Sequence, residues 1–304
     1  MKKIVSSLAA VAAALFVGCA STDRGRPEDL KVLMIGNSFS ISCLQHLPNV
    51  AVDLGVNLDL ASLYIGGCSM KRHWENITKA DDDSAFRPYR FDRFVRGKRV
   101  VEAAKRNIQE VLKSADWDIV TIQQASHESF RIDTFSPYGD SLIETIRQYA
   151  PKAKIVLQET WSYTPWDKRL EKWKIDQNEM YEKLHAAYGE FAARHGLRAI
   201  PMGTAVQEWR RRLPVKYTEN SFGGDVVGGG GQAARDHFKR NADNVWVPTC
   251  DVFHLNRRGA YFQALVWAAA LFGGVDLAEM EYRPDFVSED DARLMREIAM
   301  GLAR

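Results

Sequence analysis

Short apolar runs and longer segments with helical spacing alternate along most of the chain. The apolar runs predict buried strands over residues 30–35, 58–65, 117–123, 153–158 and 197–201. Apolar residues at helical spacing predict helices over residues 41–54, 100–114, 141–149, 173–195, 203–212 and 255–272. The charged and aromatic segment 71–98 predicts a long excursion over the surface.

This alternation of strands and helices is typical of a parallel sheet that helices cover on both faces. We therefore predict an α/β fold with three layers, α/β/α, around a mostly parallel sheet of five strands. No internal repeat interrupts the pattern, so residues 30–304 are expected to form a single domain. In such sheets ligands bind beyond the carboxyl ends of the strands, which directs attention to the polar residues there.

The first residues resemble a bacterial lipoprotein signal. Two lysines precede an apolar stretch, 4–17, that is too short to span a bilayer as a stable helix. A small residue and Cys19 follow and resemble a lipobox, in which the Cys is lipidated and becomes the mature N-terminus. We predict a signal peptide over 1–19, a tether over 20–29, and an exported protein anchored by lipid to a membrane of the bacterial cell envelope. An ordinary secretory peptide is the alternative.

Charge and cysteine content narrow the possible partners. The net charge is +2, from 41 basic and 39 acidic residues, so no strong positive field favours nucleic acid as a partner. With Cys19 set apart three cysteines remain, enough for one disulfide, for which Cys68 and Cys250 are candidates. The cysteine spacing matches no zinc site, and the acidic run 81–83 lacks the alternating ligands of a calcium loop. We predict neither a metal nor another cofactor.

Ser38 follows directly after the first predicted strand, in the sequence Gly36-Asn37-Ser38-Phe39-Ser40. A serine at a strand-to-helix turn lies near a helix N-terminus, where backbone amides and the helix dipole favour negative charge. That position suits a nucleophile whose attack generates an oxyanion. The alternative is that Ser38 or Ser40 only caps the helix.

Three further polar motifs fall at strand ends or before a helix. Gly67 follows the second strand, where a glycine lets the backbone approach a ligand and offer an amide. Gln123 and Gln124 end the third strand, and their amides are donors of the kind that stabilise an oxyanion. Asp251 and His254 precede the last long helix and are spaced so that Asp could orient His as a general base. Taken singly, each motif is also compatible with an ordinary turn, loop or cap.

The order and placement of these motifs resemble the SGNH, or GDSL-like, hydrolases over most of the chain after residue 30. The resemblance implies a flavodoxin-like fold of three layers. It also implies that Ser38 is the nucleophile, His254 the base and Asp251 the acid of a catalytic triad. The Gly67 amide would join the Ser38 amide in the oxyanion hole.

The third block, Gln123-Gln124-Ala125-Ser126, departs from the usual pattern of these hydrolases and looks like the carbohydrate acetylesterase branch. That likeness implies that the Gln124 side chain completes the oxyanion hole. Gln123 and Ser126 remain alternatives for this donor.

Four residues near the motifs are candidates for substrate contact: Gln123, His73, His127 and Trp161. The resemblance and the predicted export together imply a serine esterase that needs no cofactor and removes acyl groups, above all acetyl, from a glycan. The alternatives are a hydrolase of lipid, aryl or thioesters, and a surface lipoprotein that binds glycans without turnover.

Overall fold

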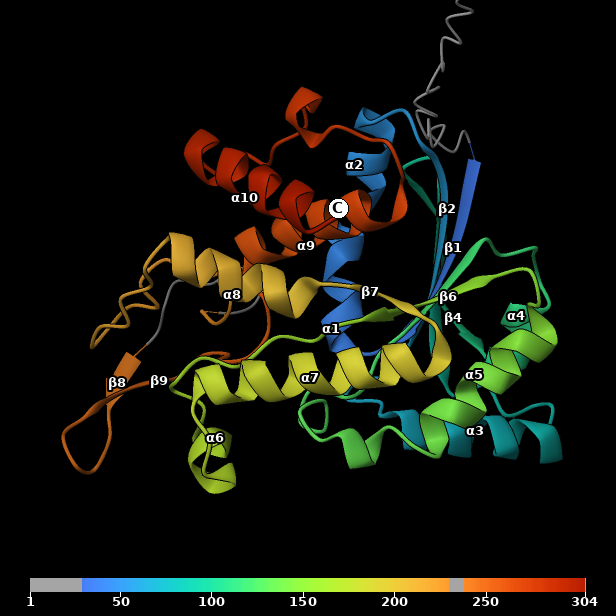
Figure 1. Cartoon of the computed structure of the whole chain (residues 1–304), viewed down its shortest axis with the longest axis horizontal. Coiled ribbons are helices and arrows are strands. Elements are labelled where there is room, and N and C mark those ends of the chain that lie inside the picture. The colour runs from blue at the N-terminus through green and yellow to red at the C-terminus, as the bar shows by residue number, and fades with distance from the viewer. Residues whose placement is uncertain (1–28, 230–237, 304) are drawn as a thin grey trace, which may run out of the picture.

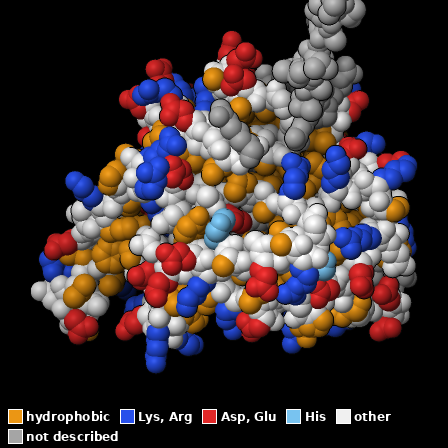
Figure 2. Space-filling view, viewed as in Figure 1, with side chains coloured by type: hydrophobic (Ala, Val, Ile, Leu, Met, Phe, Trp, Pro, Cys, Tyr) orange, Lys and Arg blue, Asp and Glu red, His pale blue; other side chains and the backbone are white. Residues whose placement is uncertain are grey.

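The structure, a computed structural model, describes residues 29–229 and 238–303. The predicted signal peptide, residues 1–19 with Cys19, and all but the last residue of the predicted tether, 20–29, lie outside the described residues. Among the helices that are described, none combines the length and the apolar character needed to cross a membrane. Acidic and basic side chains are interspersed over the face shown in Figure 2.

The central sheet has seven strands in the order β4-β3-β2-β1-β5-β6-β7. The strands are β1 (Asp29–Gly36), β2 (Asn57–Tyr64), β3 (Tyr89–Val95), β4 (Lys98–Arg106), β5 (Ile119–Ile122), β6 (Lys154–Gln158) and β7 (Arg198–Ile200). The five predicted strands are confirmed as β1, β2, β5, β6 and β7, which are parallel to one another. Their order is that of flavodoxin-like sheets, whose topological switch point lies between the strands that correspond here to β1 and β5.

The predicted count of five strands is wrong, because β3 and β4 add an antiparallel hairpin beside β2. The segment 71–98 therefore contains a strand rather than only a surface excursion. The helix predicted over 100–114 is also wrong. Most of β4 is exposed, with 56% of Val100 open to solvent, so this edge strand lacks the apolar alternation that identifies a half-buried strand. A short helix begins only at Ile108, after the Asn107–Glu110 capping box.

Helices cover both faces of the sheet, as predicted (Figure 1). The long ones are α3 (Met70–Asp82), α5 (Tyr138–Tyr149), α7 (Gln177–His195), α8 (Met202–Arg212), α9 (Arg257–Leu271) and α10 (Glu289–Leu302). The short ones are α1 (Ser38–Ile41), α2 (Leu47–Asp53), α4 (Ile108–Leu112) and α6 (Lys168–Trp173), with 3-10 turns η1 (Ser42–Gln45), η2 (Ile132–Thr134) and η3 (Leu277–Glu279). A separate two-stranded ribbon joins β8 (Phe238–Arg240) to β9 (Trp246–Pro248).

Different helices form the two layers on either side of the sheet. α9 is buried along most of its length and packs against α2, α8 and α10 on one face of the sheet. α5 packs against α3 and α4 on the other face, and the His195–Asp140 ion pair, 2.7 Å between Nε2 and Oδ1, joins α7 to α5. In Figure 1, α2, α9 and α10 accordingly lie in the upper part of the view and α3, α5 and α7 in the lower part. The carboxyl ends of the parallel strands are thus held between two packed layers.

Candidate active site

Ser38 is the first residue of α1, directly beyond the carboxyl end of β1. The helix cap is Asn37, whose Oδ1 accepts a hydrogen bond of 3.0 Å from Phe39 N–H. The Ser40 hydroxyl donates to the Asn37 carbonyl at 3.0 Å. Capping therefore does not account for Ser38, whose hydroxyl is left for another partner.

That partner is His254. Its Nε2 lies 2.8 Å from the Ser38 Oγ, and its Nδ1 lies 2.5 Å from Asp251 Oδ2. The three side chains form one hydrogen-bonded chain, in which imidazole can accept the hydroxyl proton and the carboxylate can stabilise the resulting imidazolium. The predicted nucleophile, base and acid are thus brought together, although Ser38 and His254 are 216 residues apart in the sequence.

Asp251 is held as a carboxylate. Its partial burial alone would raise its pKa, but the hydrogen bonds from the His254 ring and from the N–H groups of His254 and Phe253 outweigh burial and lower the pKa. Both N–H groups donate to Oδ1 at 2.8 Å, while Oδ2 faces the imidazole. The acid is therefore ionised at neutral pH, and its orientation toward His254 is fixed by the backbone of its own turn.

The turn of residues 251–254 is secured through all four of its carbonyl groups. The Asp251 and His254 carbonyls accept hydrogen bonds from the N–H groups of Gly229 and Gly228. The Val252 carbonyl accepts from the N–H and the hydroxyl of Thr164, and the Phe253 carbonyl accepts from the indole N–H of Trp161. All of these bonds are 2.8–3.1 Å long. Because each bond would have to break before the turn could shift, the position of His254 is determined from two separate segments of the chain.

A buried ion pair stabilises one of these two segments. Arg210 Nη2 lies 2.9 Å from Asp225 Oδ2, with only 6% and 0% of the two side chains exposed. Tyr217 adds a bond of 2.6 Å to the same carboxylate. Asn256, two residues after His254, bonds to the Asp225 and Val226 carbonyls at 2.8 and 2.9 Å. The ion pair therefore holds in place the segment 225–229, which is hydrogen-bonded to the turn and to Asn256.

Asn37 connects three of the strand ends that carry the predicted motifs. Its Nδ2 donates to the Cys68 carbonyl at 3.0 Å, after β2. Its Oδ1 accepts from Gln123 Nε2 at 2.6 Å, after β5. The motifs that the sequence placed at separate strand ends thus meet around the residue that precedes Ser38, at the β1–β5 switch point.

Two backbone N–H groups expected in the oxyanion hole are available. Neither Ser38 N–H nor Gly67 N–H donates to another group within the part of the chain that the structure describes. Gly67 has φ +59°, in the left-handed region that favours glycine, and a Cβ there would meet nothing within 4 Å. Space alone would therefore admit a side chain at Gly67, but other residues adopt this backbone conformation only with strain.

The prediction that Gln124 completes the oxyanion hole is wrong in this geometry. Its side chain is fully buried, and its Nε2 donates to the Thr134 carbonyl and hydroxyl at 2.8 and 3.2 Å. Its Oε1 accepts from the N–H groups of Met70 and Ala125, both at 2.9 Å. Gln124 thus joins β5 to the start of α3 and has no amide hydrogen left for a substrate. Ser126, the other alternative in this block, is buried and bonded to the Tyr163 hydroxyl at 2.8 Å.

Three of the four predicted substrate contacts are buried, so they are closed to a substrate. Trp161 is 0% exposed and stacks on Phe39 at 4.1 Å between ring centroids. Its side chain supports the His254 turn through the bond to the Phe253 carbonyl. His73 is 0% exposed and bonded to the Tyr89 hydroxyl, and burial followed by the charge of Arg72 lowers its pKa to about 3. These two predictions are wrong because a residue after a strand end can turn into the core as readily as toward a ligand.

Gln123 is also buried, and its amide is bonded to Asn37 rather than open to substrate. His127 is exposed, with its Nε2 3.9 Å from Glu128, and it is not part of the cleft described next. Cys68 carries a free, fully buried thiol, whose pKa burial raises to about 12, so it does not form the disulfide with Cys250 for which the sequence left room.

A cleft of about 390 Å³ opens onto the Ser38–His254–Asp251 chain. Besides these three residues it is lined by Ile41, Ser42, Leu44, Gln45, Arg90, Asp92, Arg99 and Leu255. We call Ser38, Asp251 and His254 the Ser38 wall, and Arg90, Asp92 and Arg99, which belong to β3 and β4, the hairpin wall. A cleft of this size suits a ligand about as large as a monosaccharide.

The hairpin wall was missed by the sequence analysis. Arg90 and Asp92 alternate with apolar residues in the sequence of β3, YRFDRFV, and that period-2 pattern was the signal that could have identified the strand. Nothing comparable marks Arg99, because no residue of β4 is fully buried and only Val101 and Ala104 pack partly against the core.

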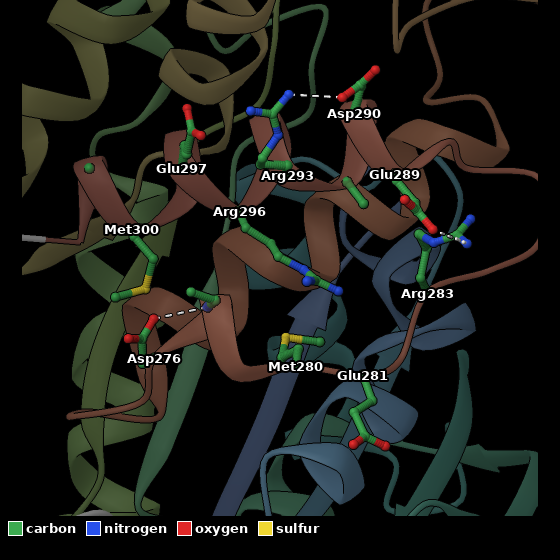
Figure 3. Close-up of a pocket in the computed structure, with 13 residues that line it drawn as sticks. Asp276, Met280, Glu281, Arg283, Glu289, Asp290, Arg293, Arg296, Glu297 and Met300 are labelled. Atoms are coloured by element: carbon green, nitrogen blue, oxygen red, sulfur yellow. Dashed lines mark hydrogen bonds and ion pairs between the residues drawn. The ribbon is translucent and has the colours of Figure 1, made fainter.

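A larger hollow, about 1100 Å³, lies between η3 and α10, away from Ser38 (Figure 3). It is lined by carboxylates, arginines and two methionines, and contains no Ser, Cys or His. In Figure 3 two of its arginines lie beside carboxylates, with Arg293 Nη2 2.8 Å from Asp290 Oδ1 and Arg283 Nη2 3.8 Å from Glu289 Oε1. Size alone would favour this hollow, but of the two only the smaller cleft contains a serine hydroxyl bonded to an imidazole. Within residues 29–229 and 238–303, no group of three or more His, Cys, Asp or Glu side chains is arranged to hold a metal ion.

Comparison with solved structures supports the fold. The chain is similar to a DUF4886 family protein from Bacteroides uniformis ATCC 8492, with 24% identity over 90% of this chain and 94% of that chain and a TM-score of 0.70. Weaker matches include a member of the lipolytic protein G-D-S-L family from Veillonella parvula DSM 2008 (12% identity, 81% and 100% covered, TM-score 0.43). They also include a family 3 carbohydrate esterase from Clostridium thermocellum (10% identity, 79% and 94% covered, TM-score 0.42).

A comparison with curated proteins found no match. The model of one family, described as a domain of unknown function, matches residues 31–226. This range begins in β1 and includes Ser38, Gly67 and the other six strands of the central sheet, but it ends before Asp251 and His254. Since the match covers well over half of the 304 residues, the chain belongs to the DUF4886 family.

Proposed function

We propose that this protein is a serine esterase that hydrolyses acyl esters, above all acetyl esters, of carbohydrates. The observation that carries the proposal is the continuous hydrogen-bonded chain from the Ser38 hydroxyl through His254 to Asp251, with bonds of 2.8 and 2.5 Å. A hydroxyl becomes a nucleophile when a neighbouring base can take its proton as it attacks, and this chain of bonds supports His254 as that base and Asp251 as the acid that orients it.

In the first half of the proposed reaction, His254 Nε2 takes the Ser38 proton as Oγ attacks the ester carbonyl carbon. The carbonyl oxygen becomes an oxyanion that accepts hydrogen bonds from Ser38 N–H and Gly67 N–H. Each such donor contributes about 3–4 kcal/mol of transition-state stabilisation. The bond between the carbonyl carbon and the alcohol oxygen then breaks, and the imidazolium returns its proton to that oxygen.

In the second half, water replaces the alcohol. His254 Nε2 takes a proton from the water, whose oxygen attacks the acyl carbon on Ser38. The new oxyanion collapses, the bond to Oγ breaks, and the proton on His254 passes back to Oγ. The products are a carboxylic acid and the free enzyme, and Asp251 stays ionised throughout because its lowered pKa disfavours protonation.

The lining of the cleft supports a small acyl group and a polar alcohol. Its apolar side chains are limited to Ile41, Leu44 and Leu255, and the other eight residues that line it are polar or charged. A long acyl chain needs an extended apolar surface, as in lipid hydrolysis, and this cleft does not offer one. We further propose that the enzyme acts in the cell envelope, held by lipid on Cys19, on the basis of the sequence of the first 29 residues.

Ser38→Ala tests the proposal. It is expected to lower kcat for 4-nitrophenyl acetate by about four to six orders of magnitude, as loss of the nucleophile does in other serine hydrolases. Ser40→Ala is the matched control, since it removes a hydroxyl two residues away that bonds only to the Asn37 carbonyl. Ser38→Ala with wild-type turnover would contradict the proposed mechanism. Glycan binding that is retained in both variants, without turnover by the wild type, would favour a binding protein instead.

A further inference from the structure

The hairpin wall places two guanidinium groups beside the proposed nucleophile. Arg90 on β3 and Arg99 on β4 line the same cleft as Ser38 and His254. In each of the two arginines 41% of the side chain is exposed, so both remain accessible to a ligand. No step of the proposed reaction uses either residue.

Both guanidinium groups keep unused donors. Arg90 binds Asp92 through Nε and Nη2, at 2.7 and 3.2 Å, which leaves its Nη1 hydrogens without a partner among the described residues. Arg99 donates from Nη1 to Glu102, a residue whose side chain is 64% exposed. An exposed pair of this kind contributes little to stability, so a ligand displaces Glu102 at little cost.

The carboxylates of the cleft are already engaged. Asp92 is 1% exposed and accepts from Arg90 and, at 3.2 Å, from Ala103 N–H. Asp251 accepts from the His254 ring and from two backbone N–H groups. An incoming ligand therefore meets guanidinium hydrogens that lack partners and carboxylate oxygens that have them, although the formal charges of the cleft nearly cancel.

We propose that Arg90 and Arg99 bind an anionic group on the carbohydrate of the substrate, so that the preferred substrate is an acyl ester of an acidic sugar. This inference rests on the proposed esterase function. A planar guanidinium binds a carboxylate or a sulfate through parallel, charge-assisted hydrogen bonds, which neutral sugar hydroxyls cannot equal. Because the cleft is only about 390 Å³, the anionic group lies on the acylated sugar or on the sugar next to it.

Three substrates that differ at one carbon atom test this inference: mono-O-acetylated methyl galactoside, its uronic acid and its 6-sulfate. The wild type is expected to show a kcat/KM for one or both charged esters at least about tenfold above that for the neutral ester. Added salt is expected to reduce this preference, because it screens the charges. The uronic acid and the sulfate identify which anion the site prefers.

Arg99→Gln is expected to lower kcat/KM for the preferred charged ester about tenfold more than for the neutral ester. Arg99→Lys is expected to keep part of the preference, since it keeps the charge but not the planar fork. The matched control is Arg293→Gln in the groove of Figure 3, because Arg293 also forms an exposed pair with a carboxylate three residues away in the sequence. That control is expected to leave all three rates unchanged.

Equal rates on the three esters, or an equal loss on all three in Arg99→Gln, would overturn the inference while leaving the esterase proposal intact. If none of the three esters is hydrolysed, calorimetry with methyl galacturonate and methyl galactoside decides the inference, and the esterase proposal fails only if 4-nitrophenyl acetate is not hydrolysed either. Binding of the galacturonate that Arg99→Gln abolishes would then support the anion site, and absence of that binding would overturn it.

Discussion

The two walls of the cleft are built in opposite ways. In the Ser38 wall the turn 251–254 has every carbonyl bonded, and the fully buried indole of Trp161 lies beneath it. In the hairpin wall both arginines are 41% exposed. Arg90 is bound to the buried Asp92, whereas Arg99 lies on an edge strand that is mostly open to solvent and pairs with the exposed Glu102. Hydrogen bonds hold the side chains of the Ser38 wall in place, whereas the Arg99 guanidinium of the hairpin wall is free to rearrange.

This difference matches two distinct requirements of catalysis on a variable substrate. Bond-making needs nucleophile and base held in a productive geometry by surrounding packing. Recognition of the rest of the substrate tolerates movement and benefits from charges at an open mouth, which also attract a ligand of opposite sign. Changes in the Ser38 wall should therefore affect all esters, and changes in the hairpin wall should affect esters according to their charge.

Asp251→Asn should have the largest effect among the variants that sharpen this comparison. An Asn side chain can still accept from the N–H groups of Phe253 and His254, but its amide presents hydrogens to Nδ1 and favours the wrong imidazole tautomer. We expect kcat to fall about ten-thousand-fold on neutral and charged esters alike, with the fold retained. A kcat within tenfold of wild type, measured on 4-nitrophenyl acetate, would remove Asp251 from the mechanism.

Arg210→Met tests whether burial supports the Ser38 wall. Removing one member of a buried pair leaves the Asp225 carboxylate uncompensated, which typically costs about 3–5 kcal/mol of unfolding free energy. Arg293→Met is the control, since its exposed pair with Asp290 should contribute less than about 1 kcal/mol. Urea denaturation measures both variants, and equal losses would show that the buried pair has no special role.

Trp161→Phe removes one donor from the His254 turn and retains an aromatic ring against Phe39. The Phe253 carbonyl loses its partner, which should cost about 1–3 kcal/mol of stability and lower kcat more than it changes KM. Trp267→Phe is the matched control, because the indole N–H of that equally buried Trp has no partner within the described residues. If the two variants lower kcat to the same extent, the bond to Phe253 does not position the base.

The smallest expected effect is a dependence of stability on pH. The pKa of Asp251 is lower in the folded protein than in the unfolded chain, so its contribution to stability is complete above about pH 4. That contribution is lost as the pH falls through the folded-state pKa. The difference in unfolding free energy between wild type and Asp251→Asn should therefore shrink between pH 6 and pH 3, and a constant difference would argue against an ionised, hydrogen-bonded Asp251.

Sequence patterns predicted the parallel part of the fold because buried strands are short apolar runs that leave little ambiguity. The hairpin could not be predicted in the same way. No residue of its outer strand, β4, is fully buried, so the sequence lacks the apolar alternation of a strand. The apolar residues of 100–112 match a helical period instead, because the segment runs on into α4. Only pairing with β3, a tertiary interaction, makes this segment a strand.

For the site, the sequence identified the positions where polar residues leave the strands, and Ser38, Asp251 and His254 do meet there. It could not determine which way a side chain turns after a strand end. Gln124 and Trp161 lie at such ends but point into the core, where they join neighbouring segments. Arg90 and Arg99 reach the cleft from a hairpin for which the predicted fold had no place.

The central claim is that Ser38 is an activated nucleophile, and covalent labelling tests it most directly. The full-length protein is treated with a fluorophosphonate, which reacts with activated serine hydroxyls, and the labelled peptide is mapped by mass spectrometry. We predict a single label on Ser38 that is lost in Ser38→Ala and strongly slowed in His254→Ala. A label on another residue, or equally fast labelling of Ser38 without His254, would contradict the account.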